Sequence, residues 1–333
     1  MLLNSPLDLV FDDLFVSIEG ILENNTVNLK LEGSTIGGSV KMKPALKMIG
    51  RLEMSGQLKK GGTVIESTSG NLGIALSIIC AVKGYNFICV VDPHILEATE
   101  KLISAYGAEI VKVTKFDDNG GYLSTRIKYI KDAISCNKDI VWVNQYENLD
   151  NAEAHYLQTA PEIAKQFPKI DYLFIGAGTT GTLSGVSRYI RPRFPNTKII
   201  AVDAVGSVNF GNPSGKRFIP GLGASKEMPL SRLSIFDTVL LVHELDTIKM
   251  CHRMVSKGLL FGGSTGTVLS AIEQYRAHIP EGSKVVGISP DFGERYLDTI
   301  YNPVWVSRCY PTMRDSDIHI NNHQNEESSY NHV

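Results

Sequence analysis

The chain has 333 residues, 43% of them hydrophobic and 20% charged, a composition typical of a soluble globular enzyme. This length predicts two domains or one large one. The 33 basic and 35 acidic residues give a net charge of −2, so nothing in the charge balance indicates a nucleic-acid or anionic-membrane partner.

The five cysteines and the first residues of the chain bear on the cellular compartment. The cysteines are widely spaced and form no Cys-x-x-Cys pair, which favours a reducing environment. The N-terminal residues lack the basic start of a secretory signal, and the longest apolar stretch, 72–82, is too short to span a bilayer. We therefore expect a cytoplasmic protein with no membrane partner. The histidines show no metal-ligand spacing, so no metal is expected.

Predicted strands and helices alternate through the first half of the chain. Short apolar runs predict strands at 64–66, 87–91, 109–113 and 140–143. Helices are predicted at 70–82, at 97–106, and where Leu123, Ile127, Ile130 and Ile134 mark one apolar face. Gly84 ends the first of these helices.

The same alternation continues in the second half, with predicted strands at 172–175, 198–202 and 284–288. Apolar strands separated by helices predict parallel sheets that are covered by helices on both faces. We expect two α/β domains with a cleft between them. The predicted boundaries are an N-terminal segment at 1–40 packing partly on the larger domain, a smaller mobile domain at 41–150, the larger domain at 151–310, and a polar, disordered tail at 311–333.

The first candidate site residue is Lys41, which follows Gly37, Gly38 and Ser39. Most lysines are solvated surface residues. Glycines, however, allow a ligand to approach the backbone closely. A lysine in such a place can form a Schiff base with a carbonyl cofactor, provided that its pKa is lowered.

The second candidate is the run Ser67-Thr68-Ser69-Gly70-Asn71, which opens a predicted helix. A helix N-cap needs only one such residue. Five small or polar residues in a row indicate an anion, such as a carboxylate or phosphate, at the positive end of the helix. An amine beside an anion site suggests amino-acid chemistry on pyridoxal phosphate (PLP).

The third candidate is the glycine- and threonine-rich run 176–182, which directly follows a predicted strand. It matches the dinucleotide fingerprint Gly-x-Gly-x-x-Gly, and Asp203 ends the next strand at the distance expected of a ribose-binding acid. An NAD-dependent dehydrogenase is therefore a rival interpretation. The threonine hydroxyls suit a single phosphate monoester equally well, because both ligands use backbone amides at a helix N-terminus.

Two further features are less specific. The run 262–267, which contains Ser264, opens another predicted helix and by itself indicates no more than a helix cap. It is the third helix start rich in small residues, after 67–71 and 176–182, and a dehydrogenase does not require three. Arg126 lies on the flank of the apolar helix face. It belongs to a solvated surface unless that helix borders the cleft.

These motifs, in this order, resemble the fold-type II PLP enzymes of the cysteine synthase family over roughly 10–306. The resemblance implies a two-domain, three-layer α/β/α fold with mostly parallel sheets, of the tryptophan synthase β type, and a homodimer. It implies that Lys41 is the catalytic residue and that the larger domain anchors the cofactor. The implied cofactor-binding residues are Lys41, Asn71, Gly178, Thr179, Thr180, Gly181, Thr182 and Ser264, with Asn71 at the ring hydroxyl and Ser264 facing the ring nitrogen.

The resemblance also implies where amino-acid substrates bind. The donor carboxylate is expected on Thr68, Ser69 and Asn71, with Gln145 nearby. Arg126 and Tyr146 are candidates for holding a substrate phosphate or carboxylate, since arginine suits bidentate recognition of either group. These assignments are transferred from the family pattern, residue by residue.

Finer motifs at 66–76, 202–208 and 220–225 resemble one branch of the family, the N-(2-amino-2-carboxyethyl)-L-glutamate synthases of 2,3-diaminopropionate pathways, as in staphyloferrin B siderophore assembly. This implies that O-phospho-L-serine and L-glutamate give the named product and phosphate through an aminoacrylate intermediate, for a siderophore or a peptide natural product. The chain departs from the pattern at Thr35-Ile36 and Met42-Lys43, and at Gly178, where the branch often has serine.

Two alternatives within the resemblance remain open. A cysteine synthase-like enzyme that uses O-acetylserine or O-phosphoserine with sulfide shares every cofactor residue. A regulatory module could also bind PLP without turnover.

Overall fold

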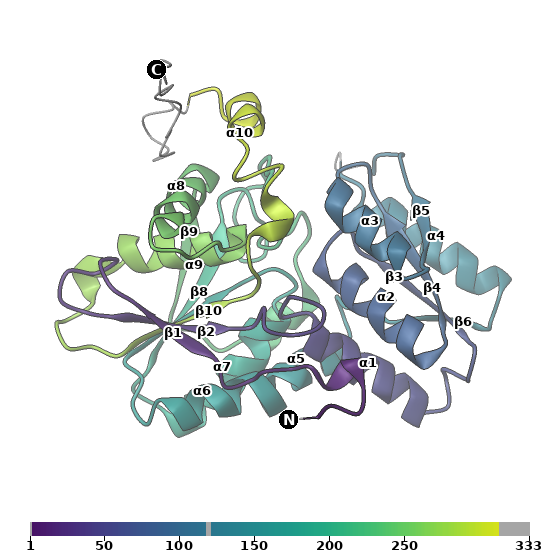
Figure 1. Cartoon of the computed structure of the whole chain (residues 1–333), viewed down its shortest axis with the longest axis horizontal. Helices are drawn as coiled ribbons and strands as arrows, with labels where there is room; N and C mark the ends of the chain where they lie inside the picture. The colour runs from purple at the N-terminus through teal and green to yellow at the C-terminus, as the bar shows by residue number, and fades with distance from the viewer. Residues whose placement is uncertain (1, 118–120, 313–333) are drawn as a thin grey trace, which may run out of the picture.

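The computed structural model describes residues 2–117 and 121–312 and arranges them around two sheets (Figure 1). The strands are β1 (Phe15–Ile18), β2 (Val27–Leu31), β3 (Thr63–Ser67), β4 (Asn86–Val91), β5 (Glu109–Lys112), β6 (Ile140–Trp142), β7 (Tyr172–Gly176), β8 (Lys198–Ala204), β9 (Thr238–Val242) and β10 (Val285–Ser289). The predicted tail lies, from residue 313 onward, outside the described residues.

Helices cover both sheets. The α-helices are α1 (Met42–Met54), α2 (Asn71–Lys83), α3 (Glu97–Ala105), α4 (Leu123–Cys136), α5 (Leu149–Ala154), α6 (Ala160–Gln166), α7 (Gly181–Arg193), α8 (Glu244–Val255), α9 (Gly263–Gln274) and α10 (Pro303–Cys309). The π-helix η2 (His155–Thr159) joins α5 to α6, and short 3-10 helices are η1 (Pro6–Asp8), η3 (Pro229–Leu233), η4 (Arg276–His278) and η5 (Glu294–Tyr296). No helix in the described ranges is long and apolar enough to cross a membrane.

The larger sheet has six strands in the order β1-β2-β10-β7-β8-β9. Only the β1–β2 pair is antiparallel, and the other neighbours run parallel. One apolar layer packs α8 and α9 against the sheet, and a second packs α6 and α7 against the opposite face. The result is three layers, with the carboxyl ends of the central parallel strands at one edge.

The smaller sheet has four parallel strands in the order β5-β4-β3-β6. Helices α1, α2 and α3 pack on one face, and α4 packs on the other. Helix α2 is buried from Leu72 to Cys80, because nearly all of its residues are apolar or small. Gly84 ends it in the left-handed conformation, as the sequence predicts.

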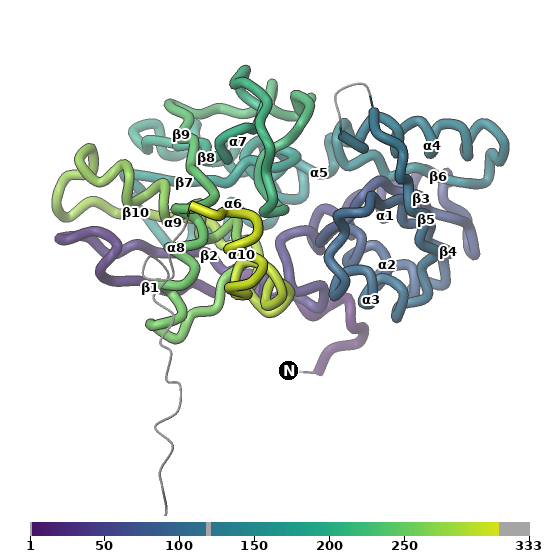
Figure 2. Tube along the Cα trace, turned by 90° about the horizontal axis from the view of Figure 1, so that it is seen from above, coloured from purple at the N-terminus to yellow at the C-terminus, as the bar shows by residue number. Residues whose placement is uncertain are grey.

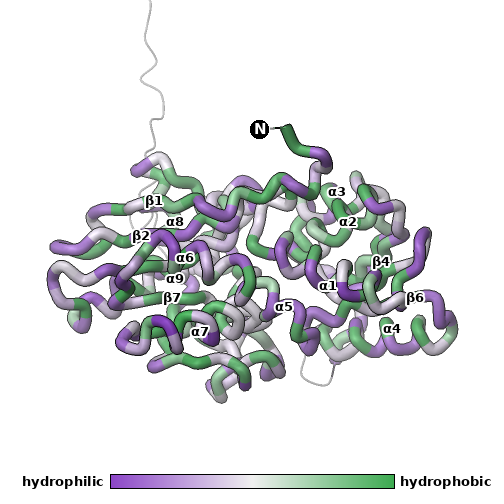
Figure 3. Tube along the Cα trace, turned by 90° about the horizontal axis from the view of Figure 1, so that it is seen from below, coloured by the Kyte–Doolittle hydropathy of each residue, from purple (hydrophilic) through white to green (hydrophobic). Residues whose placement is uncertain are grey.

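The two bodies stand side by side, each with its own apolar interior (Figure 2). Figure 3 shows hydrophobic segments running through the middle of each body and hydrophilic segments toward the outer turns. The predicted fold class, α/β with mostly parallel sheets in three layers, is confirmed. The first two strands of the chain, β1 and β2, extend the larger sheet beside β10. The sequence analysis predicted no strand in this part of the chain, because polar residues interrupt its apolar runs.

Candidate active site

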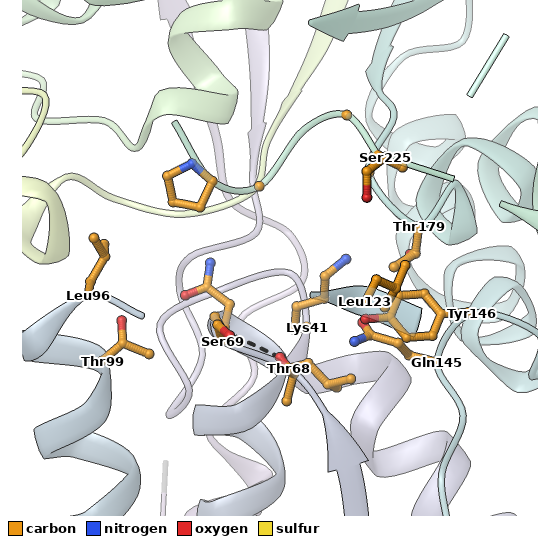
Figure 4. Close-up of a pocket in the computed structure, with 18 of the residues that line it drawn as sticks. Lys41, Thr68, Ser69, Leu96, Thr99, Leu123, Gln145, Tyr146, Thr179 and Ser225 are labelled. Carbon is orange, nitrogen blue, oxygen red and sulfur yellow. Dashed lines mark hydrogen bonds between the residues drawn. The ribbon is translucent and has the colours of Figure 1, made fainter. Parts of the chain in front are cut away.

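A cavity of about 290 Å³ lies between the two bodies and is lined by segments from both sheets. This volume suits a small organic ligand. The residues predicted from the sequence that line it are Lys41, Thr68, Ser69, Asn71, Arg126, Gln145, Tyr146, Gly178 and Thr179. Figure 4 shows Lys41 between the Thr68–Ser69 loop and the pair Gln145 and Tyr146, with Thr179 and Ser225 beyond.

Lys41 precedes helix α1 and carries its amine into this cavity. The approach to it needs a left-handed glycine at Gly38, where φ is +63° and any side chain would collide with the Arg295 guanidinium. Burial lowers the pKa of Lys41 to about 8, although the nearby Asp291 carboxylate opposes the shift. The neutral, nucleophilic fraction of this amine at neutral pH is therefore much larger than that of an ordinary lysine.

The lowered pKa predicts how the apoprotein captures a carbonyl compound. Because the neutral amine is the nucleophile, the rate of PLP capture should rise with pH up to about 8 and level off above it. Mixing apoprotein with PLP over a pH series and following the absorbance measures this midpoint. A midpoint near 10.5, the ordinary lysine value, would contradict the burial of the amine.

The loop 68–71 joins the end of β3 to the start of α2. Gly70 is the N-cap of α2, and no side chain caps this helix, so its first amide groups are open to an anion. The Ser69 hydroxyl is held by Asp92, to which it donates over 3.0 Å. Asn71 donates to Asp291 over 2.7 Å and accepts from Arg295 over 2.6 Å, which ties the smaller body to the larger one.

The predicted phosphate cradle lies at the N-terminus of α7. Thr180 is the N-cap in the left-handed conformation, with φ +63°, and no side chain caps the helix. Gly178 and Thr179 line the cavity, whereas Thr180, Gly181 and Thr182 do not. A side chain at Gly181 would collide with Asn151, so the backbone here is held close to its neighbours.

A buried chain of hydrogen bonds supports this cradle from behind. The Thr182 hydroxyl lies 3.2 Å from Nε2 of His155, whose Nδ1 lies 3.0 Å from the Thr159 hydroxyl. Thr159 in turn accepts from Lys43, which pairs with the buried Glu32. Burial lowers the pKa of His155 to about 3, so its imidazole is neutral at physiological pH.

Ser264 is the second residue of α9 and faces a small neighbouring cavity. Its hydroxyl makes no hydrogen bond to another residue in the described parts of the chain. Gly221, at φ +110°, passes so close to Ser264 Oγ that any side chain at Gly221 would displace the hydroxyl. The serine hydroxyl is thus an unpaired polar group beside the main cavity.

Arg126 is not a solvated surface residue, because α4 borders the cavity and leaves the residue only 9% exposed. Its guanidinium pairs with Asp92 at 3.1 Å and donates to the Ser69 hydroxyl over 3.0 Å. Tyr146 donates to the Ser67 carbonyl over 3.0 Å, and Gln145 donates to the same carbonyl over 3.1 Å. These contacts fix the three side chains on the wall of the cavity.

Sequence reasoning missed several residues of the cavity. Arg217, Ser225, Arg295 and Tyr296 line it, and Asp291 lies behind Asn71. The run 293–297 also resembles the family pattern and could have drawn attention to Arg295 and Tyr296, whereas nothing in the local pattern singles out Arg217. Asp291 accepts from Tyr296 over 2.5 Å, and burial raises its pKa.

Comparison with known proteins identifies the chain. Residues 16–291 match the family described as "Pyridoxal-phosphate dependent enzyme". The chain belongs to this family. It is 40% identical over 281 residues, 84% of this chain and 83% of the relative, to an N-(2-amino-2-carboxyethyl)-L-glutamate synthase of Ralstonia nicotianae. The family membership makes this protein a PLP-dependent β-replacement enzyme of fold-type II, acting on small amino-acid substrates.

Solved structures of the family share the fold. An O-acetylserine dependent cystathionine beta-synthase from Helicobacter pylori aligns with a TM-score of 0.83 and 28% identity, over 90% of this chain and 98% of that one. A hydrogen sulfide-producing enzyme from Fusobacterium nucleatum aligns with a TM-score of 0.82 and 32% identity, over 89% and 99% of the two chains. An O-ureido-L-serine synthase reaches 0.84 and 30%, over 91% and 96%.

The residues of the cavity fit PLP. A buried amine with a lowered pKa, an uncapped helix N-terminus behind Gly178 and an unpaired hydroxyl on Ser264 match the aldehyde, the phosphate and the ring nitrogen of the cofactor. The dehydrogenase interpretation is wrong, since the family is PLP-dependent. Asp203, its predicted ribose-binding acid, is wholly buried.

Proposed function

We propose that this enzyme joins O-phospho-L-serine to L-glutamate, giving N-(2-amino-2-carboxyethyl)-L-glutamate and phosphate. The observation that carries the proposal is a single cavity lined by a lysine with a lowered pKa, by the uncapped N-terminus of α2, where a carboxylate can bind, and by the arginines Arg126 and Arg217. The 40% identical relative named for this reaction supports it.

Three parts of the site would bind the cofactor. The amides and hydroxyls of 178–182 would hold the cofactor phosphate, and Ser264 would face the ring nitrogen. A carboxylate in that place would keep the ring nitrogen protonated, whereas a hydroxyl does not. Bound there, PLP supplies an electron sink that lets a Cα proton leave and a β-substituent depart. Asn71 would contact the ring hydroxyl, provided that its present partners, Asp291 and Arg295, give way on one side.

Substrate binding and proton transfer follow from the walls of the cavity. The donor carboxylate would bind the first amides of α2 with Thr68 and Ser69, because anions are stabilised at a helix N-terminus. The Lys41 amine, neutral above pH of about 8, would take the Cα proton and return it after the new bond forms. Arg126 and Tyr146 would hold the donor phosphate.

The proposed reaction has a direct test. Purified enzyme is given O-phosphoserine with either glutamate or sulfide, and phosphate release and product mass are measured. We expect rapid phosphate release with glutamate and the mass of the condensed product. Cysteine formation as the faster reaction would instead identify the cysteine synthase-like alternative. No phosphate release with either acceptor would identify a PLP-binding module without turnover.

Replacing Arg126 tests the donor site. Arg126→Ala should lower kcat/KM for O-phosphoserine about tenfold to 100-fold, since one charge-assisted contact is lost. The absorption of bound PLP should stay unchanged. Lys128→Ala, on the exposed face of the same helix, is the matched control and should change neither. Equal loss of cofactor and turnover would make Arg126 a structural residue.

The wider setting is also a proposal. The reaction would serve 2,3-diaminopropionate formation for a siderophore or peptide natural product, in the cytoplasm, by a homodimer. Residues 41–150 would form the smaller, mobile domain, and residues 151–310 the larger domain that anchors the cofactor. Residues 1–40 would pack partly on the larger domain, whose sheet β2 joins beside β10. Light scattering on the purified enzyme measures the oligomeric state.

A further inference from the structure

Two cationic side chains of the cavity, Lys41 and Arg217, have no hydrogen bond or ion pair with another residue in the described part of the chain, and the proposed reaction so far gives a role only to Lys41. The cavity is lined by four cationic residues, namely Lys41, Arg126, Arg217 and Arg295. Arg126 pairs with Asp92, and Arg295 donates to Asn71 and to a backbone carbonyl. Arg217 makes no hydrogen bond or ion pair within residues 2–117 and 121–312, and its Nε and Nη1 atoms are buried.

Burying guanidinium donors without acceptors is unfavourable, so the absence of a partner needs a reason. Burial lowers the pKa of Arg217, and the nearby carboxylates Asp203 and Glu244 only partly oppose this shift. Neither carboxylate forms an ion pair with Arg217 in the described ranges. Glu244 already accepts from the backbone amides of Phe218 and Ile219 and from the Tyr310 hydroxyl. The described part of the protein therefore places two negative charges near Arg217 but provides no acceptor in direct contact with its guanidinium.

The fold holds the Arg217 guanidinium in place. It packs against Gly223, which has φ +78°, and a side chain at Gly223 would collide with it. Together with Gly223 and Ser225, Arg217 lines the cavity from the segment between β8 and β9. The proposed donor-binding residues, from Thr68 to Tyr146, all come from the other body of the molecule.

We propose that Arg217 binds a carboxylate of the acceptor amino acid and so selects a dicarboxylic acceptor, an inference that rests on the proposed function. The donor already has its carboxylate and phosphate sites on the opposite wall. An acceptor that attacks through its amine must present that amine while its carboxylates are held elsewhere, and the planar guanidinium fork matches a carboxylate. Sulfide needs no such contact.

The test separates the two half-reactions of the holoenzyme. Arg217→Gln should release phosphate from O-phosphoserine, in the first turnover, with a half-saturating concentration within about twofold of wild type. Its KM for glutamate should rise about tenfold to 100-fold, because a charge-assisted contact is lost. Arg217→Lys, which keeps the charge and the stem, should recover part of the loss. Arg232→Gln, an exposed arginine of the same segment, is the matched control and should behave as wild type.

A comparison of two acceptors, measured on the wild type and on Arg217→Gln, separates acceptor selection from a general loss of activity. The wild type should prefer glutamate to glutamine, which lacks the side-chain carboxylate, and Arg217→Gln should lose most of this preference. An unchanged KM for glutamate in Arg217→Gln, or an equal loss with glutamate and glutamine, would overturn the inference. A raised half-saturating concentration for O-phosphoserine would assign Arg217 to the donor phosphate and overturn it too. A wild-type enzyme that does not use glutamate at all would instead overturn the proposed function.

Discussion

Lys41→Ala should give a folded, colourless protein whose turnover is lower by about 10⁴-fold, because the same amine both holds the cofactor and moves the Cα proton. The side chain lies in a cavity, and its amine forms no hydrogen bond or ion pair with another described residue, so the fold should survive its loss. Absorbance of the purified protein and single-turnover phosphate release measure the two losses.

The control for this variant is Lys60→Ala, an exposed lysine in the turn before β3. It should keep the colour and the activity of the wild type. A yellow, active Lys41→Ala enzyme would mean that another amine holds the cofactor. A Lys41→Ala protein with a lowered melting temperature would mean that the lysine has a structural role as well.

Gly221→Ala should have the second largest effect, because it combines backbone strain with a steric clash. Gly221 has φ +110°, and a Cβ there would collide with the Ser264 hydroxyl. Left-handed strain costs about 1–2 kcal/mol, and overpacking adds about 1–3 kcal/mol. We expect lower thermal stability and a loss of PLP affinity of at least about tenfold, measured by unfolding and by cofactor titration.

Gly211→Ala separates the two causes. Gly211 also has a left-handed φ, of +78°, but a side chain there would meet nothing within 4 Å. It should therefore show the strain cost alone and keep its PLP affinity. If both variants lose PLP equally, the contact between Gly221 and Ser264 is not what positions the serine.

The alternation of apolar runs and helices made the fold predictable from the sequence. The run 87–91 became β4 because it lies between β3 and β5 and is covered by helices on both faces, where a continuous apolar strand is stable. The same argument missed β1 and β2. Strand β2 contains Asn28 and Lys30, which look polar in sequence but are buried and satisfied by contacts that only the folded chain supplies.

Those parts of the site that consist of one short stretch of sequence could be predicted from the sequence. The loop 68–71 and the cradle at 178–182 are helix entrances, and their small and polar residues are visible in sequence. Arg217 was not predictable in this way, since its lack of partners depends on Glu244 being occupied by the backbone amides of Phe218 and Ile219. The pairing of Arg126 with Asp92 likewise joins residues 34 positions apart, so only the structure brings it to light.

Borohydride reduction of the holoenzyme, followed by peptide mapping, tests the central claim most directly. Reduction fixes PLP covalently to the amine that holds it, and mass spectrometry then locates the modified lysine. We predict a single modified peptide, the one that contains Lys41. Modification at another lysine, or a protein that retains no PLP, would contradict the account.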